Sequence, residues 1–92
     1  MPEAKEKDAS DWSVYMVICR DKSLYTGIAR DVEARIIVHN RGLGAKYTRN
    51  RRPVRLAYSE RCGDQSGALK REHAIKNLSR AEKLALAASH KA

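Results

Sequence analysis

Five side chains have the types and order needed to cleave a phosphodiester bond: Tyr15, Tyr25, Arg35, His39 and Glu72. Phenol and imidazole groups can move protons, and a guanidinium can balance charge on phosphoryl oxygens. A carboxylate can hold a divalent cation against a phosphate. This set predicts a metal-assisted phosphodiesterase, provided that the fold brings the five together.

The charge of the chain favours a polyanionic partner. The 92 residues include 19 Lys and Arg against 11 Asp and Glu, a formal net charge of +8 with a pI near 9.9. Such a balance attracts nucleic acid through counterion release, although it would also suit a membrane surface or simple solubility. The length allows one small domain, so any substrate selectivity must be built into that domain.

One stretch concentrates this charge. Between residues 41 and 55 there are six cations and no acid, with one aromatic ring among them. Phosphates can bind the cations and an unpaired base can stack on the ring. We therefore predict a nucleic-acid-binding loop formed by Arg41, Lys46, Tyr47, Arg49, Arg51, Arg52 and Arg55.

The two tyrosines lie in a predicted β-hairpin. Residues 13–19 and 24–28 are rich in β-branched and aromatic types, with residues 21–23 as the loop. In that register Arg20 faces Leu24, and both tyrosines share one face of the ribbon with Val17, Cys19 and Gly27. A two-residue loop would separate the tyrosines.

The rest of the chain predicts three helices and one more strand. Asp31 caps a helix that runs to Asn40 and ends at Gly42 or Gly44. An irregular loop leads to a strand at 54–60, then Asp64 or Ser66 caps a helix to about residue 78. Ser79 and Glu82 form a capping-box pattern for a last helix to about residue 88. The expected fold is α/β (α+β): a three-stranded, mainly antiparallel sheet flanked by about three helices in the order β-β-α-β-α-α.

The helical spacing places three candidate site residues on inward faces. Arg35 and His39 share a stripe with Val32 and Ile36. Glu72 lies near Ile75 on the apolar stripe of the second helix. The alternatives are a snorkelling arginine, a satisfied semi-buried histidine, and an i,i+4 ion pair of Glu72 with Lys76.

The remaining features concern the limits of the domain, the cysteines, the location of the protein and its oligomeric state. Residues 1–11 are charged and without periodicity, which predicts a disordered tail before a domain at 12–90. Cys19 and Cys62 are interpreted as buried thiols, with a disulfide as the open alternative. No apolar run has transmembrane length and no secretory leader is visible, so we expect a cytoplasmic protein without a membrane partner. A monomer is expected, with a dimer left open.

The motifs resemble those of the GIY-YIG endonuclease domain, and of its small single-domain bacterial members, over about residues 12 to 80. Ser13-Val14-Tyr15 stands where the family has Gly-Ile-Tyr, and Tyr25-Thr26-Gly27 stands for Tyr-Ile-Gly. Arg35 follows the second tyrosine by ten residues, as the family's essential arginine does. The run Arg35 to Asn40 resembles the structure-selective branch, and Glu72 matches the family's metal-binding glutamate.

The resemblance implies an endonuclease that depends on Mg²⁺ (or Mn²⁺) and hydrolyses phosphodiester bonds in nucleic acid, with DNA expected. Glu72 would hold the metal, Arg35 would balance phosphoryl charge, and Tyr15 would activate water with its pKa lowered by nearby cations. Tyr25 would orient the water and His39 would assist proton transfer. The alternatives are a non-catalytic nucleic-acid-binding module on the same fold and a small adaptor domain with Ile37 and Val38 at a protein interface.

Overall fold

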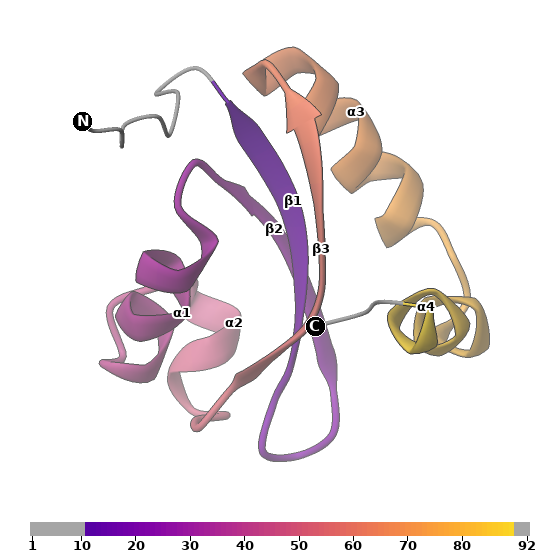
Figure 1. The fold of residues 1–92 in the computed structure, drawn as a ribbon. Helices are drawn as coiled ribbons and strands as arrows, with labels where there is room; N and C mark the ends of the chain where they lie inside the picture. Colours follow the sequence, from indigo (N-terminus) through magenta and orange to yellow (C-terminus); the bar gives the residue numbers. More distant parts are fainter. Residues whose placement is uncertain (1–10, 90–92) are drawn as a thin grey trace.

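A computed structural model describes residues 11–89 and contains one three-stranded sheet with four helices in that range (Figure 1). The strands are antiparallel and stand in the order β2-β1-β3, so the first strand is central. Along the chain the elements are β1 (Trp12–Ile18), β2 (Leu24–Ala29), α1 (Val32–Asn40), α2 (Lys46–Arg49), β3 (Arg55–Gly63), α3 (Gln65–Lys76) and α4 (Arg80–Ala88). The predicted fold class and the order of its main elements are confirmed.

The hairpin register differs from the predicted one by two residues. Leu24 pairs with Ile18 rather than Arg20, and Tyr25 pairs with Val17, so residues 19–23 form the loop. Because side chains alternate with period two, a shift of two keeps every residue on its predicted face. Asp21 organises the longer loop by accepting hydrogen bonds from the Ser23 backbone N–H and hydroxyl.

The two faces of the sheet bury separate cores. On one face Tyr15, Val17 and Cys19 pack with Val32 and Ile36 of α1. On the other, the core is formed by Val14, Met16 and Ile75, with Leu86 and Ala87 of α4 packed against it. Figure 1 shows α1 and α2 on one side of the sheet and α3 and α4 on the other. The two cysteines belong to different cores, and both are free thiols; only Cys19 is fully buried.

The predicted helix caps are observed. Asp31 accepts from the Ala34 N–H, and Asp64, rather than Ser66, accepts from the Gly67 N–H. Gly42 adopts a left-handed φ of +80° just after α1, a conformation that ends a helix at little cost for glycine. Ser79 and Glu82 form the full capping box of α4.

The segment predicted to be irregular contains one turn of helix. α2 has four residues and its N-cap, Ala45, makes no side-chain capping bond, so the sequence carries no start signal for it. β3 is also longer than predicted and reaches Gly63, with register shifts against β1 that mark bulges. The Arg52–Pro53 peptide bond is cis.

The predicted tail at residues 1–11 falls almost entirely outside the described residues, which begin at Asp11. Between residues 11 and 89, no helix has both the length and the apolar character needed to cross a membrane.

Candidate active site

The centre of the candidate site is a buried hydrogen bond between Tyr15 of β1 and His39 of α1. The Tyr15 hydroxyl lies 2.7 Å from His39 Nε2. Tyr15 is 1% exposed and His39 is completely buried. A strand residue and a helix residue 24 positions apart are thus joined at their polar ends, as the face assignments predict.

The second ring nitrogen identifies the tautomer of His39. Nδ1 lies 2.9 Å from the hydroxyl oxygen of buried Thr48, and that hydroxyl donates its single hydrogen to the Ala45 carbonyl. The Thr48 oxygen can therefore only accept from His39, which places a proton on Nδ1. In the neutral imidazole Nε2 is then an acceptor, and the Tyr15 hydroxyl donates to it.

Tyr25 of β2 completes the aromatic wall. Its ring meets the His39 ring edge-on at a centroid distance of 5.4 Å and stacks on Tyr47 of α2 at 5.9 Å. Gly27 makes this packing possible, because a Cβ at that position would lie 2.8 Å from the Tyr15 hydroxyl oxygen and 3.2 Å from Tyr25 Cε2. The second motif glycine therefore leaves room for both tyrosines.

Burial controls the protonation of the central pair. It raises the pKa of Tyr15 to about 12, and hydrogen bonding and charge from Arg35 offset this only in part. The expectation that neighbouring cations lower the pKa of Tyr15 is wrong for this state, because desolvation outweighs them. Burial, followed by the charge of Arg35, lowers the pKa of His39, so the imidazole is neutral at pH 7.

Arg35 and Glu72 act on Tyr15 from two different helices. Arg35 stands one turn before His39 in α1. Glu72 belongs to α3 on the other side of the sheet, and its charge still reaches the Tyr15 hydroxyl. The two sides meet at β2, an edge strand, where a hollow of about 380 Å³ is lined by Leu24, Tyr25, Thr26, Tyr47, Lys76 and Lys83.

The Glu72 carboxylate is paired with a cation of its own helix. Lys76 Nζ lies 3.2 Å from Glu72 Oε2, and the Glu72 side chain is 18% exposed. This is the i,i+4 ion pair that the sequence offered as the alternative to a metal ligand.

A single-carboxylate metal site fits these residues. Among the described residues no cluster of three or more His, Cys, Asp or Glu could hold a metal by itself. Glu72 places one partly buried carboxylate next to Lys76, which lines the hollow beside Tyr25, and within residues 11–89 only its Oε2 has a partner. Mg²⁺ is often held by one or two carboxylates together with substrate phosphates and water.

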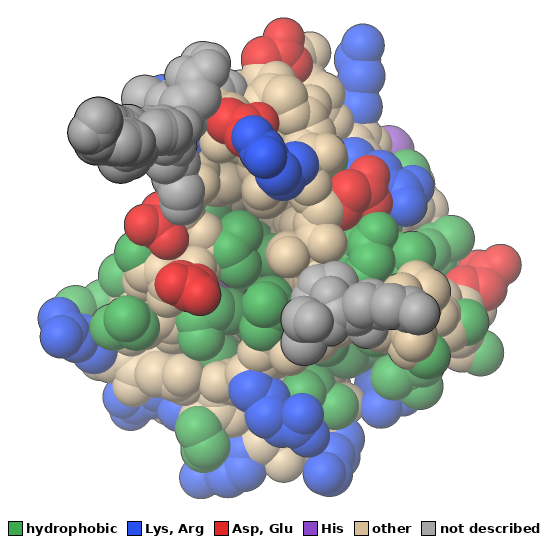
Figure 2. Space-filling model, viewed as in Figure 1, with side chains coloured by type: hydrophobic (Ala, Val, Ile, Leu, Met, Phe, Trp, Pro, Cys, Tyr) green, Lys and Arg blue, Asp and Glu red, His purple; other side chains and the backbone are tan. Residues whose placement is uncertain are grey.

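The predicted basic loop runs from the end of α1 to the start of β3. Arg41 is the C-cap of α1, Lys46, Tyr47 and Arg49 form most of α2, and Arg55 opens β3. Figure 2 shows Lys and Arg without Asp or Glu along the lower edge of the molecule, where Figure 1 places the β1–β2 loop and the segment between α2 and β3.

Two members of this loop are held by the protein itself. Arg51 pairs with Asp21 at 3.0 Å, donates to the Tyr47 carbonyl at 2.7 Å, and lies 4.0 Å over the Tyr47 ring. Arg52 donates to the Arg49 carbonyl at 2.8 Å. Tyr47 thus has Tyr25 and Arg51 against its ring, and a base can stack on it only by displacing one of them.

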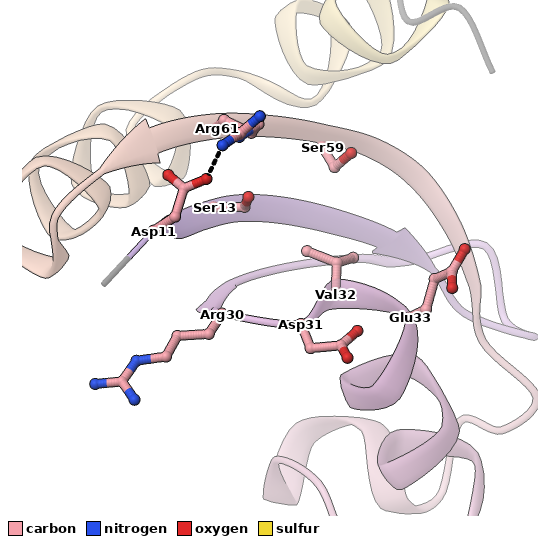
Figure 3. Close-up of a pocket in the computed structure, with 8 residues that line it drawn as sticks. All are labelled: Asp11, Ser13, Arg30, Asp31, Val32, Glu33, Ser59 and Arg61. Carbon is pink, nitrogen blue, oxygen red and sulfur yellow. Dashed lines mark hydrogen bonds and ion pairs between the residues drawn. The ribbon is translucent and has the colours of Figure 1, made fainter. Parts of the chain in front are cut away.

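Another hollow, of about 430 Å³, lies between the N-terminal end of α1 and the paired strands β1 and β3 (Figure 3). Its lining mixes three carboxylates, Asp11, Asp31 and Glu33, with Arg30 and Arg61, and Asp11 forms an ion pair with Arg61. The carboxylates would repel a phosphate, so we do not place substrate there.

Thr48 is the functional residue that the sequence did not reveal. A threonine in a polar, glycine-rich stretch carries no signal of burial, yet it is fully buried and holds the Nδ1 proton of His39. Gly44 also lies against the His39 ring, because a Cβ at residue 44 would clash with Nδ1. The only sequence signal for this close approach was weak: a glycine that follows His39 by five residues.

Comparison with known proteins gives a family match over most of the chain. The family model described as the GIY-YIG catalytic domain matches residues 11–85. The chain is 59% identical over 73 residues to a UPF0213 protein of Staphylococcus saprophyticus, covering 79% of this chain and 89% of that protein. A UPF0213 protein of Staphylococcus aureus strain N315 gives the same identity and the same coverage.

Two solved structures share the fold. The solution NMR structure of the UPF0213 protein BH0048 from Bacillus halodurans aligns with a TM-score of 0.55 and 40% identity, over 86% of this chain and 84% of that chain. The NMR structure of the protein EF2693 from E. faecalis aligns with a TM-score of 0.59 and 36% identity, over 89% and 92% of the two chains.

Proposed function

This chain belongs to the GIY-YIG family, and on that premise we propose that it is a divalent-metal-dependent endonuclease that hydrolyses phosphodiester bonds in DNA. The GIY-YIG domain is a nuclease domain, from which a nucleic-acid substrate follows. The observation that carries the finer proposal is the Tyr15–His39 hydrogen bond, with the charges of Arg35 and, least strongly, Glu72 influencing the pKa of Tyr15.

The proposed proton path begins at the attacking water. As its oxygen forms a bond to phosphorus, the water gives a proton to the Tyr15 oxygen, while Tyr15 gives its own proton to His39 Nε2. The bond from phosphorus to the leaving oxygen breaks, and that oxygen takes a proton from solvent. The neutral Nε2 acceptor is what lets Tyr15 act as a base although its pKa is raised.

Thr48 and Arg35 would support this transfer. Thr48 keeps the Nδ1 proton in place, so that Nε2 faces Tyr15 as an acceptor. Arg35 would hold the oxygens of the scissile phosphate, since its planar fork can donate two hydrogen bonds at once. Tyr25, fixed between His39 and Tyr47, would orient the attacking water with its hydroxyl.

Glu72 would hold Mg²⁺ or Mn²⁺ against the scissile phosphate, where the ion supplies Lewis-acid polarisation and charge for the leaving oxygen. For Glu72 to bind the metal ion, Lys76 would have to release Oε2 or share the carboxylate with the ion. Its ammonium would then be available to a substrate phosphate beside Tyr25, since Lys76 also lines the hollow at that residue.

A non-catalytic binding module is the second candidate. Two observations favour it: Glu72 already forms an ion pair with Lys76, and Tyr15 is a weak acid in this state. The basic lower edge would bind nucleic acid in either case. The two candidates differ in whether the protein cleaves nucleic acid, and Glu72 holds the metal only in the catalytic one.

The deciding experiment is Glu72→Gln, which keeps the side-chain volume and removes the charge. We expect cleavage of labelled single-stranded, duplex, flap and branched DNA in Mg²⁺ or Mn²⁺ to be lost, while the fold and nucleic-acid affinity persist. Loss of the ion pair alone should cost about 0.5 kcal/mol or less of unfolding free energy. Glu33→Gln, the same change at an exposed acid of α1, is the matched control and should cleave normally.

Cleavage by Glu72→Gln at the wild-type rate would remove the metal role. A wild-type protein that cleaves none of these DNAs or the matched RNAs would favour the binding module.

A further inference from the structure

A third hollow, lined by basic side chains, lies on the outer side of the junction between α1 and α2. It has a volume of about 480 Å³ and is lined by Arg20, Asn40, Arg49, Asn50, Arg52 and Pro53. The lining holds three guanidinium groups and no carboxylate. Arg20 comes from the β1–β2 loop, outside the basic run at 41–55.

From this lining of three arginines without a carboxylate, we infer that the hollow is a phosphate-binding pocket. It would hold a nucleic-acid phosphate other than the scissile one. The inference rests on the proposed function insofar as it takes nucleic acid as the ligand. It adds to that function a second anchoring point, with Arg20 as a new contact residue.

The pocket is preorganised around Arg52. The Arg52 Nε donates to the Arg49 carbonyl at 2.8 Å, and Nη1 reaches the Asn40 carbonyl at 3.4 Å. Gly42 leaves room for this guanidinium, because a Cβ there would lie 2.9 Å from Nη1. Ordering of the arginine before binding lowers the entropy cost of holding an anion.

The other two arginines are available to a ligand. Within residues 11–89, the Arg20 and Arg49 side chains form no hydrogen bond or ion pair with a described residue, and both residues are exposed. Asp21, the acid next to Arg20, is already engaged by Ser23 and Arg51. Neither cation is therefore neutralised before a phosphate arrives.

The pocket is tied to the active site by consecutive residues. His39 and Thr48 bond to each other on the inner side of the α1–α2 junction, while their neighbours Asn40 and Arg49 line the pocket on the outer side. Asn40 fixes this arrangement, since its amide donates to the Val54 carbonyl and accepts from the Val54 N–H. A phosphate in the pocket would thus be held at a set position relative to the catalytic pair.

The test measures binding without cleavage. In a Glu72→Gln background with EDTA, the dissociation constant of a fluorescein-labelled DNA duplex is followed against salt for Arg20→Ala with Arg49→Ala. Because the pocket holds one phosphate, losing that contact should lower the log-log slope by up to roughly 0.9 on duplex DNA. Circular dichroism melting checks that the variants remain folded.

Arg30→Ala is the matched control. Arg30 is an exposed arginine that stacks on Trp12 at 5.0 Å and lines the mixed-charge hollow of Figure 3. It should leave the slope within error. A double variant that behaves like Arg30→Ala overturns the pocket.

Duplexes with and without a 5′-phosphate identify the source of the bound group. A loss confined to the 5′-phosphorylated duplex assigns the pocket to a terminal phosphate, and an equal loss on both assigns it to an internal phosphodiester. A wild-type protein that binds but does not cleave fails the proposed function and keeps the pocket. A protein that binds neither this duplex nor a matched RNA overturns both.

Discussion

Burial has opposite effects on the two central side chains. Desolvation disfavours charge, so the same apolar surroundings keep His39 neutral and Tyr15 protonated. These shifts leave the acceptor nitrogen free at pH 7 and the donor protonated, but they also oppose the transfer itself, because Tyr15 becomes a weaker acid and His39 a weaker base. The proposed path therefore requires that Tyr15 receives the water proton as it gives up its own. What burial cannot select is the tautomer, which depends on Thr48.

Replacing Thr48 should therefore uncouple the pair. In Thr48→Val the His39 Nδ1–H loses its buried acceptor, which should cost about 1 to 3 kcal/mol of unfolding free energy. We expect kcat to fall with KM nearly unchanged, since the tautomer that accepts from Tyr15 is no longer favoured. Urea unfolding and steady-state cleavage measure the two effects.

Thr48→Ser is the control, because it keeps the hydroxyl and removes only a methyl group. Equal kcat values for the valine and serine variants would show that Thr48 does not position His39.

At the scale of elements, much of the site could be predicted from the alternation of side chains along strands and from the spacing of residues along helices. The hairpin register was predicted two residues away from the observed one, yet the faces were right because an even shift preserves alternation. Asp31, Asp64 and the Ser79 capping box fixed the helix starts through local hydrogen bonds, which the sequence shows directly.

Features that depend on long-range packing could not be read in this way. α2 has no cap signal, and its four residues are too few to show a helical repeat of apolar side chains. It is held instead by contacts such as that of Thr48 with His39. Desolvation of Tyr15 likewise depends on the assembled core, so the sign of its pKa shift was predicted wrongly. The engagement of Arg51 with Asp21 joins residues 30 positions apart and has no local signature.

Arg51 should accordingly stabilise the fold rather than bind phosphate. Its side chain joins the β1–β2 loop to α2 through Asp21, the Tyr47 carbonyl and the Tyr47 ring. We expect Arg51→Ala to lower the unfolding free energy by about 1 kcal/mol and to leave the salt slope of DNA binding nearly unchanged.

Arg55→Ala is the matched comparison, since its exposed side chain has no partner among the described residues. That variant should show the reverse, with little change in melting and a slope lower by roughly 0.9. A larger slope change for Arg51 than for Arg55 would return Arg51 to the nucleic-acid surface.

Across the whole molecule, charge is distributed unevenly. The lower edge carries Lys and Arg, whereas Asp and Glu appear higher on the same view (Figure 2). Within a net charge of +8, this separation would steer a polyanion toward the edge that holds the β1–β2 loop and the segment after α2. The hydrophobic layers lie on both sides of the sheet, and Tyr15 and His39 are buried, whereas the charged edge is exposed to a ligand.

The same burial predicts how global stability varies with pH. Below about pH 6.5 the unfolded chain protonates His39 while the folded protein resists, so the unfolded state binds more protons and stability falls as pH falls. Above about pH 10 the unfolded chain loses the Tyr15 proton while the folded protein keeps it to about pH 12. Stability should therefore fall again as pH rises, by about 2 to 3 kcal/mol in full from this group.

Urea unfolding between pH 5 and 11 measures both limbs, with Tyr15→Phe as the variant that isolates the alkaline one. The phenylalanine has no proton to lose, so its alkaline limb should be shallower than that of the wild type. It should not be flat, because burial also raises the pKa of Tyr58. The acid limb should persist in Tyr15→Phe, since His39 stays buried beside Thr48 and Arg35. Parallel wild-type and Tyr15→Phe curves from pH 9 to 11 would mean that Tyr15 titrates as an exposed phenol, and the proposed proton path would then lose its buried donor.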